Sequence, residues 1–342
     1  MKLGSVAKIL TIETPELFAA AVDEAVRHLR AGEVVALPTE TVYGLAANAL
    51  DFDSVARIFE AKGRPAHNPL IVHVAGWPMI HSCVARWPGV ADRLAQHCWP
   101  GPLTLVVQKS PRIPVNVTAE GSTVGIRWPS HPFIQAVIQA CDFPLAAPSA
   151  NLANAISPTT AAHVQSSLGD RISLIIDGGP CGVGIESTVV DVTGAQPKVL
   201  RPGMIRSETI LRIADGATPN PSDEALSPVG TLRSPGLLEK HYSPRGKLLL
   251  WNWDSEPHLR DQLATHHWRH NEVRVIAFEN IPLSKDYQGV SILPRDPDAY
   301  ARAIYAELHG CDALGVTCIV VELPPAEAGW EGIHDRLRRA AA

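Results

Sequence analysis

Apolar residues recur with two different spacings along the first part of the chain. Thr14, Pro15 and Glu16 are typical of a helix start, and apolar residues recur from there to Leu29, ahead of a stop at Gly32. Short apolar runs between turn residues predict strands at residues 34–37, 70–74, 103–108, 123–128, 145–147, 172–177, 188–192 and 198–200. Helical spacing predicts further helices at about 54–61, 90–98, 132–141 and 159–168. Because helices and strands alternate, we predict an α/β fold in which helices stack on a sheet.

The composition of the chain changes at about residue 204. Residues 204–246 are rich in Pro, Ser and Gly, which indicates a linker. Beyond it, apolar strands separated by helical segments are predicted at residues 247–251, 273–278, 290–293 and 318–323. We therefore predict an N-terminal domain at 10–205, a linker at 206–246 and a smaller C-terminal α/β domain at 247–342.

Composition and charge exclude several classes of protein. With 342 residues, 46% apolar residues and a mean hydropathy of +0.03, the chain is typical of a globular protein with room for two domains. No apolar run approaches the ~20 residues of a membrane helix, and the start of the chain lacks a signal segment, so we expect a cytoplasmic protein without a membrane partner. Residues 1–206 carry 16 basic and 16 acidic side chains and residues 207–342 carry 14 and 19, which disfavours strong nonspecific nucleic-acid binding.

The six cysteines are predicted to be reduced thiols, most of them in the core. They form no CxxC pair and no His/Cys spacing suited to zinc. They are Cys83, Cys98, Cys141, Cys181, Cys311 and Cys318.

A stiff basic loop follows the second predicted helix. Arg64 precedes Pro65 and Asn68 precedes Pro69, so both are held out of the helical region. In an extended chain Lys62 and Arg64 would face the same way. A guanidinium fork beside a compact ammonium suits phosphate oxygens. Taken alone, a short motif of this kind is more often a solvated basic turn, so its interpretation depends on the rest of the chain.

Polar residues share one side of two predicted strands. His73 lies opposite an apolar face, and Thr123 shares a face with Arg127, because residues two apart on a strand point the same way. His73 alone would be interpreted as a satisfied core histidine. A buried Arg127, however, needs a carboxylate or phosphate partner, and we expect a ligand to supply it. The two strands therefore predict a cleft with one polar side.

Two further segments are dense in hydroxyl groups and glycine. Ser149 follows the strand at 145–147, and Ser157 is placed to cap the next helix, whose N-terminus would favour an anion, although capping alone would explain it. The loop at 177–188 matches neither GxGxxG nor GxxxxGK[ST]. If a nucleotide binds, side chains and other backbone amides must hold its phosphates.

Several short motifs follow one another along the N-terminal part of the chain. They are PTETVYGL at 38–45, KGRP at 62–65 with NPL at 68–70 and His73, WPGPLT at 99–104, TVGIR at 123–127, PSAN at 148–151 with SPT at 157–159, EST at 186–188 and LRPG at 200–203. In these motifs and in their order, the chain resembles the YrdC/TsaC family, the threonylcarbamoyl-AMP synthases, over about residues 10–205. Ser234-Pro235-Gly236, followed by His241-Tyr242-Ser243-Pro244 and a further α/β domain, resembles its long form. The resemblance implies a YrdC-like twisted mixed sheet with helices, linked to a smaller Rossmann-like domain.

The resemblance also implies an activity. The amine of L-threonine would take up bicarbonate, and the N-carboxylate would attack the α-phosphorus of ATP and release pyrophosphate. The product, L-threonylcarbamoyladenylate, would pass to threonylcarbamoyl-transfer proteins that modify adenosine 37 of tRNAs reading ANN codons. At most a weak direct contact between this chain and tRNA is expected. This chemistry needs no side-chain nucleophile, since alignment and charge neutralisation are sufficient. We expect Mg²⁺ to be held mainly by the phosphates of ATP, without metal ligands from the protein.

Roles follow from the resemblance for residues that match its motifs. Lys62, Arg64 and Arg127 are implied to be catalytic. The ATP side is implied to comprise Lys62, Arg64, Asn68, Thr123, Ser149, Ser157 and Arg201, with Tyr242 closing over the nucleotide as part of a lid in the linker. The threonine side is implied to comprise Thr41, His73, Arg127, Ala147 (through its backbone) and Ser187. Where family members have SANxSG, this chain has SANLAN at 149–154, which leaves the conformation of that loop open.

Two other functions are compatible with parts of the pattern. A related fold serves in carbamoyltransferases that activate carbamoyl phosphate, but no acylphosphatase or zinc-finger segment is present in this sequence. The same domain could instead bind double-stranded RNA or tRNA through its basic loop. The balanced charge of the first half weakens that alternative, and strands with a polar face suit a small-ligand cleft better.

Overall fold

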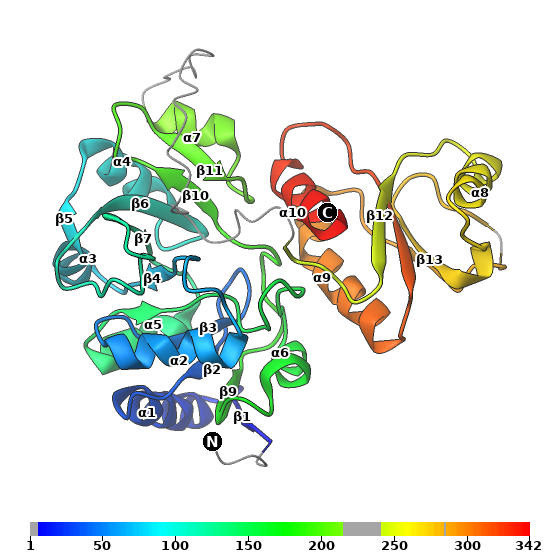
Figure 1. Cartoon of the computed structure of the whole chain (residues 1–342). Coiled ribbons are helices and arrows are strands. Elements are labelled where there is room, and N and C mark those ends of the chain that lie inside the picture. The colour runs from blue at the N-terminus through cyan, green and yellow to red at the C-terminus, as the bar shows by residue number, and fades with distance from the viewer. Residues whose placement is uncertain (1–5, 215–240, 284) are drawn as a thin grey trace.

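The computed structural model describes residues 6–214, 241–283 and 285–342. The chain forms two domains that lie side by side, with the larger N-terminal domain on the left of Figure 1. The Ser234-Pro235-Gly236 motif and most of the predicted linker lie outside the described residues. In the part that is described, no helix combines the length and the apolar character needed to cross a membrane.

The N-terminal domain is built on one mixed sheet. Within the described residues its strand order is β1-β9-β2-β3-β8-β4-β7-β6-β10-β11, and β5 pairs with β6. The strands are β1 (Lys8–Thr11), β2 (Val35–Leu37), β3 (Gly44–Asn48), β4 (Ile71–His73), β5 (Val84–Arg86), β6 (Leu103–Lys109), β7 (Thr123–Arg127), β8 (Leu145–Ala146), β9 (Leu174–Asp177), β10 (Thr188–Asp191) and β11 (Lys198–Arg201). Because β4 and β7 run parallel with His73 paired to Arg127, these two residues lie next to each other at the ends of their strands.

Helices cover both faces of this sheet. They are α1 (Pro15–Arg30), α2 (Phe52–Lys62), α3 (Trp77–Cys83), α4 (Gly89–Cys98), α5 (Pro132–Cys141), α6 (Ala161–Leu168) and α7 (Ser207–Ile213). Local chemistry sets their ends: Thr14 accepts a hydrogen bond from the backbone of Leu17 at the start of α1, and Gly63 ends α2 with a φ of 60°. One core cluster joins α1 and α5 to the sheet, and a second joins α2, α4, α6 and α7 to its other face.

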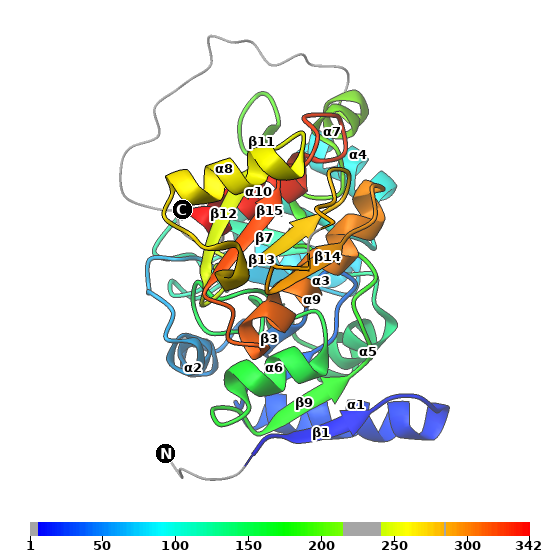
Figure 2. The same cartoon turned by 90° about the vertical axis from the view of Figure 1, so that its right-hand side faces the viewer.

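The C-terminal domain is a small parallel α/β unit. Its described strands have the order β12-β15-β13-β14, and all their pairings are parallel. The elements are β12 (Lys247–Trp251), α8 (Glu256–Thr265), a 3₁₀ turn (His270–Glu272), β13 (Val273–Ala277), β14 (Gly289–Ile292), α9 (Pro297–Ala313), β15 (Cys318–Glu322) and α10 (Glu331–Ala341). Helices α9 and α10 lie between this sheet and the N-terminal domain, and α8 lies on the far side (Figure 1). Figure 2 shows the four strands side by side in front of the larger domain.

Close packing joins the two domains. Val42 and Ile185 of the N-terminal domain share a core cluster with Tyr305 of α9 and Ile333 of α10. A Cβ added at Gly332 would lie 2.9 Å from the backbone of Gly203, so only glycine allows α10 to approach this closely. The domains therefore meet through a well-packed interface.

The predicted α/β fold and all its predicted strands and helices are confirmed, with ends displaced by at most two residues. The pattern did not predict β1, β3, β5, α3 or α7. Helix α7 falls within the range predicted as linker, yet Ile210 is buried in the N-terminal core. Part of the range predicted as linker is therefore a helix that packs on the N-terminal domain. All six cysteines are free thiols, five of them buried, as predicted.

Candidate functional site

A cavity lies where the ends of β4 and β7 face His241 and Tyr242, near the end of the predicted linker. Its volume is about 50 Å³. It is lined by Val42, Arg64, Ile71, His73, Arg127, Ala147, Pro148, Ser149, Glu186, Ser187, Arg201, His241 and Tyr242. Among these are eight of the residues predicted from the sequence to form the site. A larger surface groove of about 670 Å³ runs along α10 but contains none of the predicted site residues.

Lys62 does not have the geometry that was predicted for it. It is the last residue of α2 rather than part of an extended loop, so the expectation that Lys62 and Arg64 face the same way along an extended chain was wrong. The Lys62 ammonium donates hydrogen bonds to the carbonyl oxygens of Ser149 at 2.5 Å and Asn151 at 2.6 Å. Burial lowers the pKa of Lys62, and the charge of Arg64 lowers it further. Lys62 therefore positions the loop that carries Ser149, and it does not line the cavity.

Arg64 lines the cavity with a guanidinium that is 8% exposed at the residue level. Its Nε donates to the carbonyl of Asn68 at 3.1 Å and its NH2 group donates to that of Pro69 at 2.8 Å. No described carboxylate lies within ion-pair distance of it. Burial lowers the pKa of Arg64 to about 9, so the group is still charged at neutral pH. The cavity wall thus carries a cation whose charge the described residues do not neutralise directly.

Arg127 has a protein partner, contrary to the prediction that only a ligand would pair with it. Its NH2 group lies 2.9 Å from Glu40 Oε1. The N–H groups of this nitrogen do not point at Glu40 in the way a hydrogen bond requires. Arg127 Nε and both carboxylate oxygens of Glu40 also have no hydrogen-bond partner in the described structure. Burial opposes ionisation of Glu40, but Arg127 outweighs it and lowers the pKa of that carboxyl. Arg127 therefore lines the cavity with capacity left for a second anion.

His73 is a neutral polar group beside Arg127. Burial, followed by the charge of Arg127, lowers the pKa of His73 to about 3. Its Nδ1 atom is buried and has no hydrogen-bond partner among the described residues. A neutral imidazole with a free nitrogen can bond a hydroxyl group, and the cavity is where such a group would lie.

Arg201 and Ser187 both line the cavity and contact each other. Arg201 donates from Nε and NH2 to the carbonyl of Ser187 at 3.2 and 3.1 Å, and NH2 also contacts the Ser187 hydroxyl at 3.2 Å. The Ser187 hydroxyl in turn bonds Thr104 at 2.7 Å. Arg201 is fully buried, and burial lowers its pKa. Its guanidinium is thus held in place by backbone that belongs to the wall.

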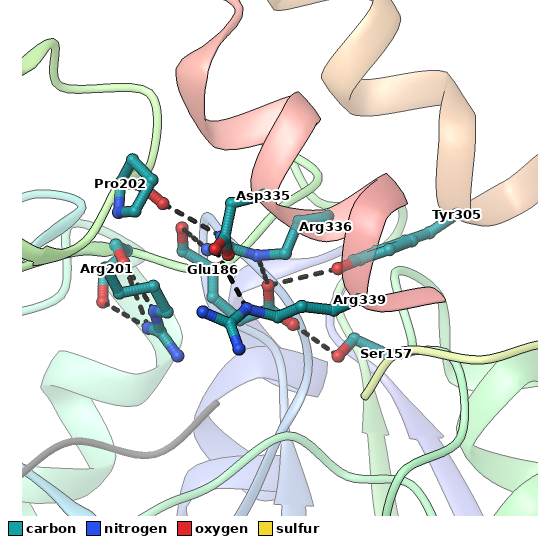
Figure 3. Close-up of polar contacts among 9 residues, drawn as sticks. Ser157, Glu186, Arg201, Pro202, Tyr305, Asp335, Arg336 and Arg339 are labelled. Carbon is teal, nitrogen blue, oxygen red and sulfur yellow. Dashed lines mark hydrogen bonds and ion pairs between the residues drawn. The ribbon is translucent and has the colours of Figure 1, made fainter. Parts of the chain in front are cut away.

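Glu186 and His241 were not predicted as site residues, although both belong to motifs that the sequence analysis quoted. Glu186 accepts hydrogen bonds from Ser157, from the Tyr305 hydroxyl at 3.2 Å and from Arg336 Nε at 2.6 Å (Figure 3). Burial would raise the pKa of Glu186, but Arg336 and Arg201 outweigh it and hold it at about 2. Two of these partners come from the C-terminal domain, so no local pattern could have revealed them.

Ser157 does not cap a helix as predicted. The side chain that caps α6 is Thr160, and the Ser157 hydroxyl donates to Glu186 instead. Thr123 shares a face with Arg127 as predicted but begins β7, about 13 Å away at 3.3 Å per residue, and it does not line the cavity. Asn68 and Thr41 are buried beside the site without lining it.

Tyr242 is already packed in place rather than held away from the site. It is 1% exposed, lines the cavity and stacks on Tyr305 with ring centroids 6.1 Å apart. His241 meets the Tyr242 ring edge-on at 4.0 Å. No group of three or more metal-ligating side chains occurs among the described residues.

Comparisons with known proteins agree with this geometry. The Sua5/YciO/YrdC family model, described as "Telomere recombination", matches residues 27–203, and a model described as "Threonylcarbamoyl-AMP synthase, C-terminal domain" matches residues 205–342. The chain is 37% identical to the threonylcarbamoyl-AMP synthase of Pyrococcus abyssi over 316 residues, which are 92% of each protein. It is 38% identical to that of Bacillus subtilis over 322 residues, covering 92% of this chain and 90% of the other.

A solved structure is similar over both domains. The crystal structure of P. abyssi Sua5 complexed with L-threonine superimposes with a TM-score of 0.87 at 36% identity, and the match covers 98% of both chains. The similarity extends from the N-terminal sheet through the C-terminal domain.

Proposed function

The chain belongs to the Sua5/YciO/YrdC family, and on that premise we propose that it is an L-threonylcarbamoyladenylate synthase. It takes L-threonine, bicarbonate and ATP and releases pyrophosphate. The product supplies the threonylcarbamoyl group for adenosine 37 of tRNAs that read ANN codons. The full-length match to enzymes of this name supports the activity, and the L-threonine in the related structure supports the amino-acid substrate.

The observation that carries the proposal is the convergence of Arg64, Arg127 and Arg201 on one cavity. Described carboxylates near the cavity pair with Arg127 and with Arg336, and Arg64 has none. A cluster of this kind attracts a polyanion, and fixed cations stabilise charge on a phosphoryl group in the transition state. The attacking oxygen is supplied by the carbamate, so the absence of a nucleophilic triad among the lining residues is consistent with the reaction.

We assign the two ends of the cavity to the two substrates. Arg127 and the neutral His73 would hold the carboxylate and hydroxyl groups of L-threonine, together with Thr41, Ser187 and the backbone of Ala147. Arg64 and Arg201 would hold the triphosphate, with Lys62, Asn68, Ser149 and Ser157 supporting or contacting the nucleotide and Thr123 in a more distant role. The support for this division is the position of His73 and Arg127 on the paired ends of β4 and β7, whereas Arg201 ends a different strand, β11.

Magnesium fits the site as part of the nucleotide. Glu186 is the carboxylate that lines the cavity, and its oxygens already accept hydrogen bonds from Ser157, Tyr305 and Arg336. The described lining residues therefore offer no acidic pair to Mg²⁺, and we expect the ion to arrive bound to ATP. Bound in this way, it would neutralise phosphate charge alongside the arginines.

The cavity must open to admit ATP. Its volume of about 50 Å³ is small beside the roughly 300–1,000 Å³ of pockets that hold drug-sized ligands. His241 and Tyr242 contribute one wall from the end of the linker, so we propose that this segment moves aside and returns as a lid. A closed lid would protect the reactive adenylate from water before transfer proteins receive it.

Incubation of the purified protein with ATP, magnesium, bicarbonate and each amino acid in turn tests the activity. We expect adenylate product, identified by its mass, with L-threonine and only when bicarbonate is present. Pyrophosphate release that is independent of threonine would overturn the proposal. RNA binding that weakens steeply with salt, without ATP turnover, would instead favour the nucleic-acid-binding alternative.

A further inference from the structure

Arg336 reaches from α10 of the C-terminal domain to the wall of the cavity (Figure 3). Its Nε donates to Glu186 Oε2 at 2.6 Å, and its NH2 group donates to the backbone carbonyl of Glu186 at 3.2 Å. Its NH1 group donates to the carbonyl of Pro202 at 2.9 Å, and Asp335 accepts a further bond from NH1 at 2.7 Å. The side chain is only 1% exposed. One guanidinium therefore fastens two separate segments of the N-terminal domain to α10.

The same guanidinium also contacts the lid. Its central carbon lies 5.3 Å from the centroid of the Tyr242 ring, within the ~6 Å typical of a cation–π contact. Tyr242 is enclosed between Arg336 and Tyr305, and both of these belong to the C-terminal domain. The position of the lid residue is thus set by the second domain.

Arg336 does not line the cavity, but each segment that it holds contributes to the lining. Glu186 and Tyr242 lie in the wall themselves, and Pro202 follows Arg201. We propose that Arg336 is a positioning residue for ATP, through which the C-terminal domain fixes Arg201, Glu186 and Tyr242 in the arrangement that binds the nucleotide. This role rests on the proposed function.

The geometry explains why arginine occupies this position. The planar fork supplies separate N–H groups to Glu186 and Pro202 while its face contacts Tyr242, and a lysine ammonium cannot do all three. Glu186 is ionised and buried, so removal of Arg336 would leave a charge without its closest cation. The unpaired Glu186 carboxylate would then repel the phosphates of ATP, and Tyr242 would lose its contact with Arg336. Both effects would disturb the ATP side first. The L-threonine side, at His73 and Arg127, is held by strand pairing within the N-terminal domain.

Calorimetry of the full-length protein with Mg-ATP and with L-threonine tests the role without requiring turnover. For Arg336→Met we expect the dissociation constant for ATP to rise roughly tenfold, within the range of couplings in one hydrogen-bonded network, and that for L-threonine to stay within about twofold. Arg336→Lys should fall between wild type and Arg336→Met, because it keeps the charge and loses the fork. Arg338→Met is the matched control, since it removes an exposed arginine from the same helix and should leave both constants unchanged.

The outcomes separate positioning from general stability. Equal weakening of ATP and L-threonine binding, or wild-type ATP binding by folded Arg336→Met and Arg336→Lys, would overturn the role. If Arg336→Met fails to fold, the two dissociation constants are measured instead on Arg336→Lys and on the double variant Glu186→Gln/Arg336→Met. The double variant also removes the unpaired charge of Glu186. Failure of the wild-type protein to form the adenylate would count against the proposed function. The binding constants would still decide whether Arg336 positions the ATP side.

Discussion

The imidazole rings of His163 and His309 stack face to face across the boundary between the two domains, with centroids 3.9 Å apart and planes 14° from parallel. His163 belongs to α6 and His309 to α9, and His309 Nε2 lies 3.1 Å from the carbonyl oxygen of Ser157. Burial, followed by the nearby His309, lowers the pKa of His163 to about 4. Burial also lowers the pKa of His309. Two neutral rings can stack in this way, whereas two charged rings would repel.

The first prediction is that acid weakens the interface between the domains. In the unfolded chain both histidines take up protons near their ordinary pKa of about 6.5, whereas in the folded chain burial lowers both pKa values, that of His163 to about 4. The unfolded state therefore binds more protons than the folded state between about pH 4 and pH 6.5. The contribution of these histidines to the free energy of unfolding is complete above about pH 6.5 and is lost as the pH drops toward 4. Urea unfolding across this range measures the effect.

A pair of variants isolates the histidine contribution. His309→Gln should show a shallower fall than wild type, because one of the two protonation sites is gone. His97→Gln removes an exposed histidine from α4 and should follow the wild-type curve. Parallel curves for wild type and His309→Gln would contradict the prediction.

The second prediction concerns Arg127 and Glu40. Arg127→Ala should abolish threonine-dependent turnover and also destabilise the fold by about 3–5 kcal/mol, because it leaves the buried Glu40 carboxylate without its cation. Adding Glu40→Gln should restore much of the stability and none of the turnover. Thermal unfolding and adenylate formation, measured on both variants, check this. Substantial threonine-dependent activity in either variant would rule out the role of Arg127.

The third prediction is that Lys62 acts through the loop it holds. Lys62→Met removes the donor to the carbonyls of Ser149 and Asn151 and should lower the free energy of unfolding by about 1–3 kcal/mol while weakening ATP binding. Lys109→Met is the comparison, because Lys109 donates to a single carbonyl, that of Ile113. It should lose less stability and leave ATP binding unchanged. A stable Lys62→Met protein that fails to bind ATP would instead indicate a direct phosphate contact.

The fourth prediction uses two helical glycines of the C-terminal domain. In Gly332→Ala the new Cβ would lie 2.9 Å from the backbone of Gly203, so α10 must shift and the stability should fall by about 1–3 kcal/mol. Gly310→Ala in α9 meets nothing within 4 Å and should stabilise the protein by about 0.5–1 kcal/mol, because alanine favours the helix. Denaturant unfolding distinguishes the two signs. A neutral Gly332→Ala would show that the interface can adjust.

Adenylate formation is expected to respond to Gly332→Ala as well. A shifted α10 would carry Arg336 away from Glu186, so ATP binding should weaken together with stability. Gly310→Ala should retain wild-type activity, since it changes no contact at the interface. Wild-type ATP binding by Gly332→Ala would show that ATP binding does not depend on the packing of α10 against the N-terminal domain.

Much of the fold followed from local pattern alone. The strand that contains His73 and the strand that contains Arg127 were both predicted, and the period of two along each correctly placed these side chains on the polar side. Ordered motifs also identified the family and brought eight lining residues into one hypothesis. These features depend on residues close in sequence, where backbone sterics and side-chain spacing decide the outcome.

Partner choice depended on the tertiary structure. Arg336 lies 150 residues from Glu186, and Arg127 lies 87 residues from Glu40 (127 − 40), so no local spacing reports either contact. The strand face of Thr123 was predicted correctly from local spacing. Its position at the other end of β7 from Arg127 nevertheless keeps it out of the cavity. Sequence by itself determined the elements, the family and the chemical types of the site residues. Only the packing of α10 against the larger domain decided which charges meet, because a buried ion needs a specific neighbour in space.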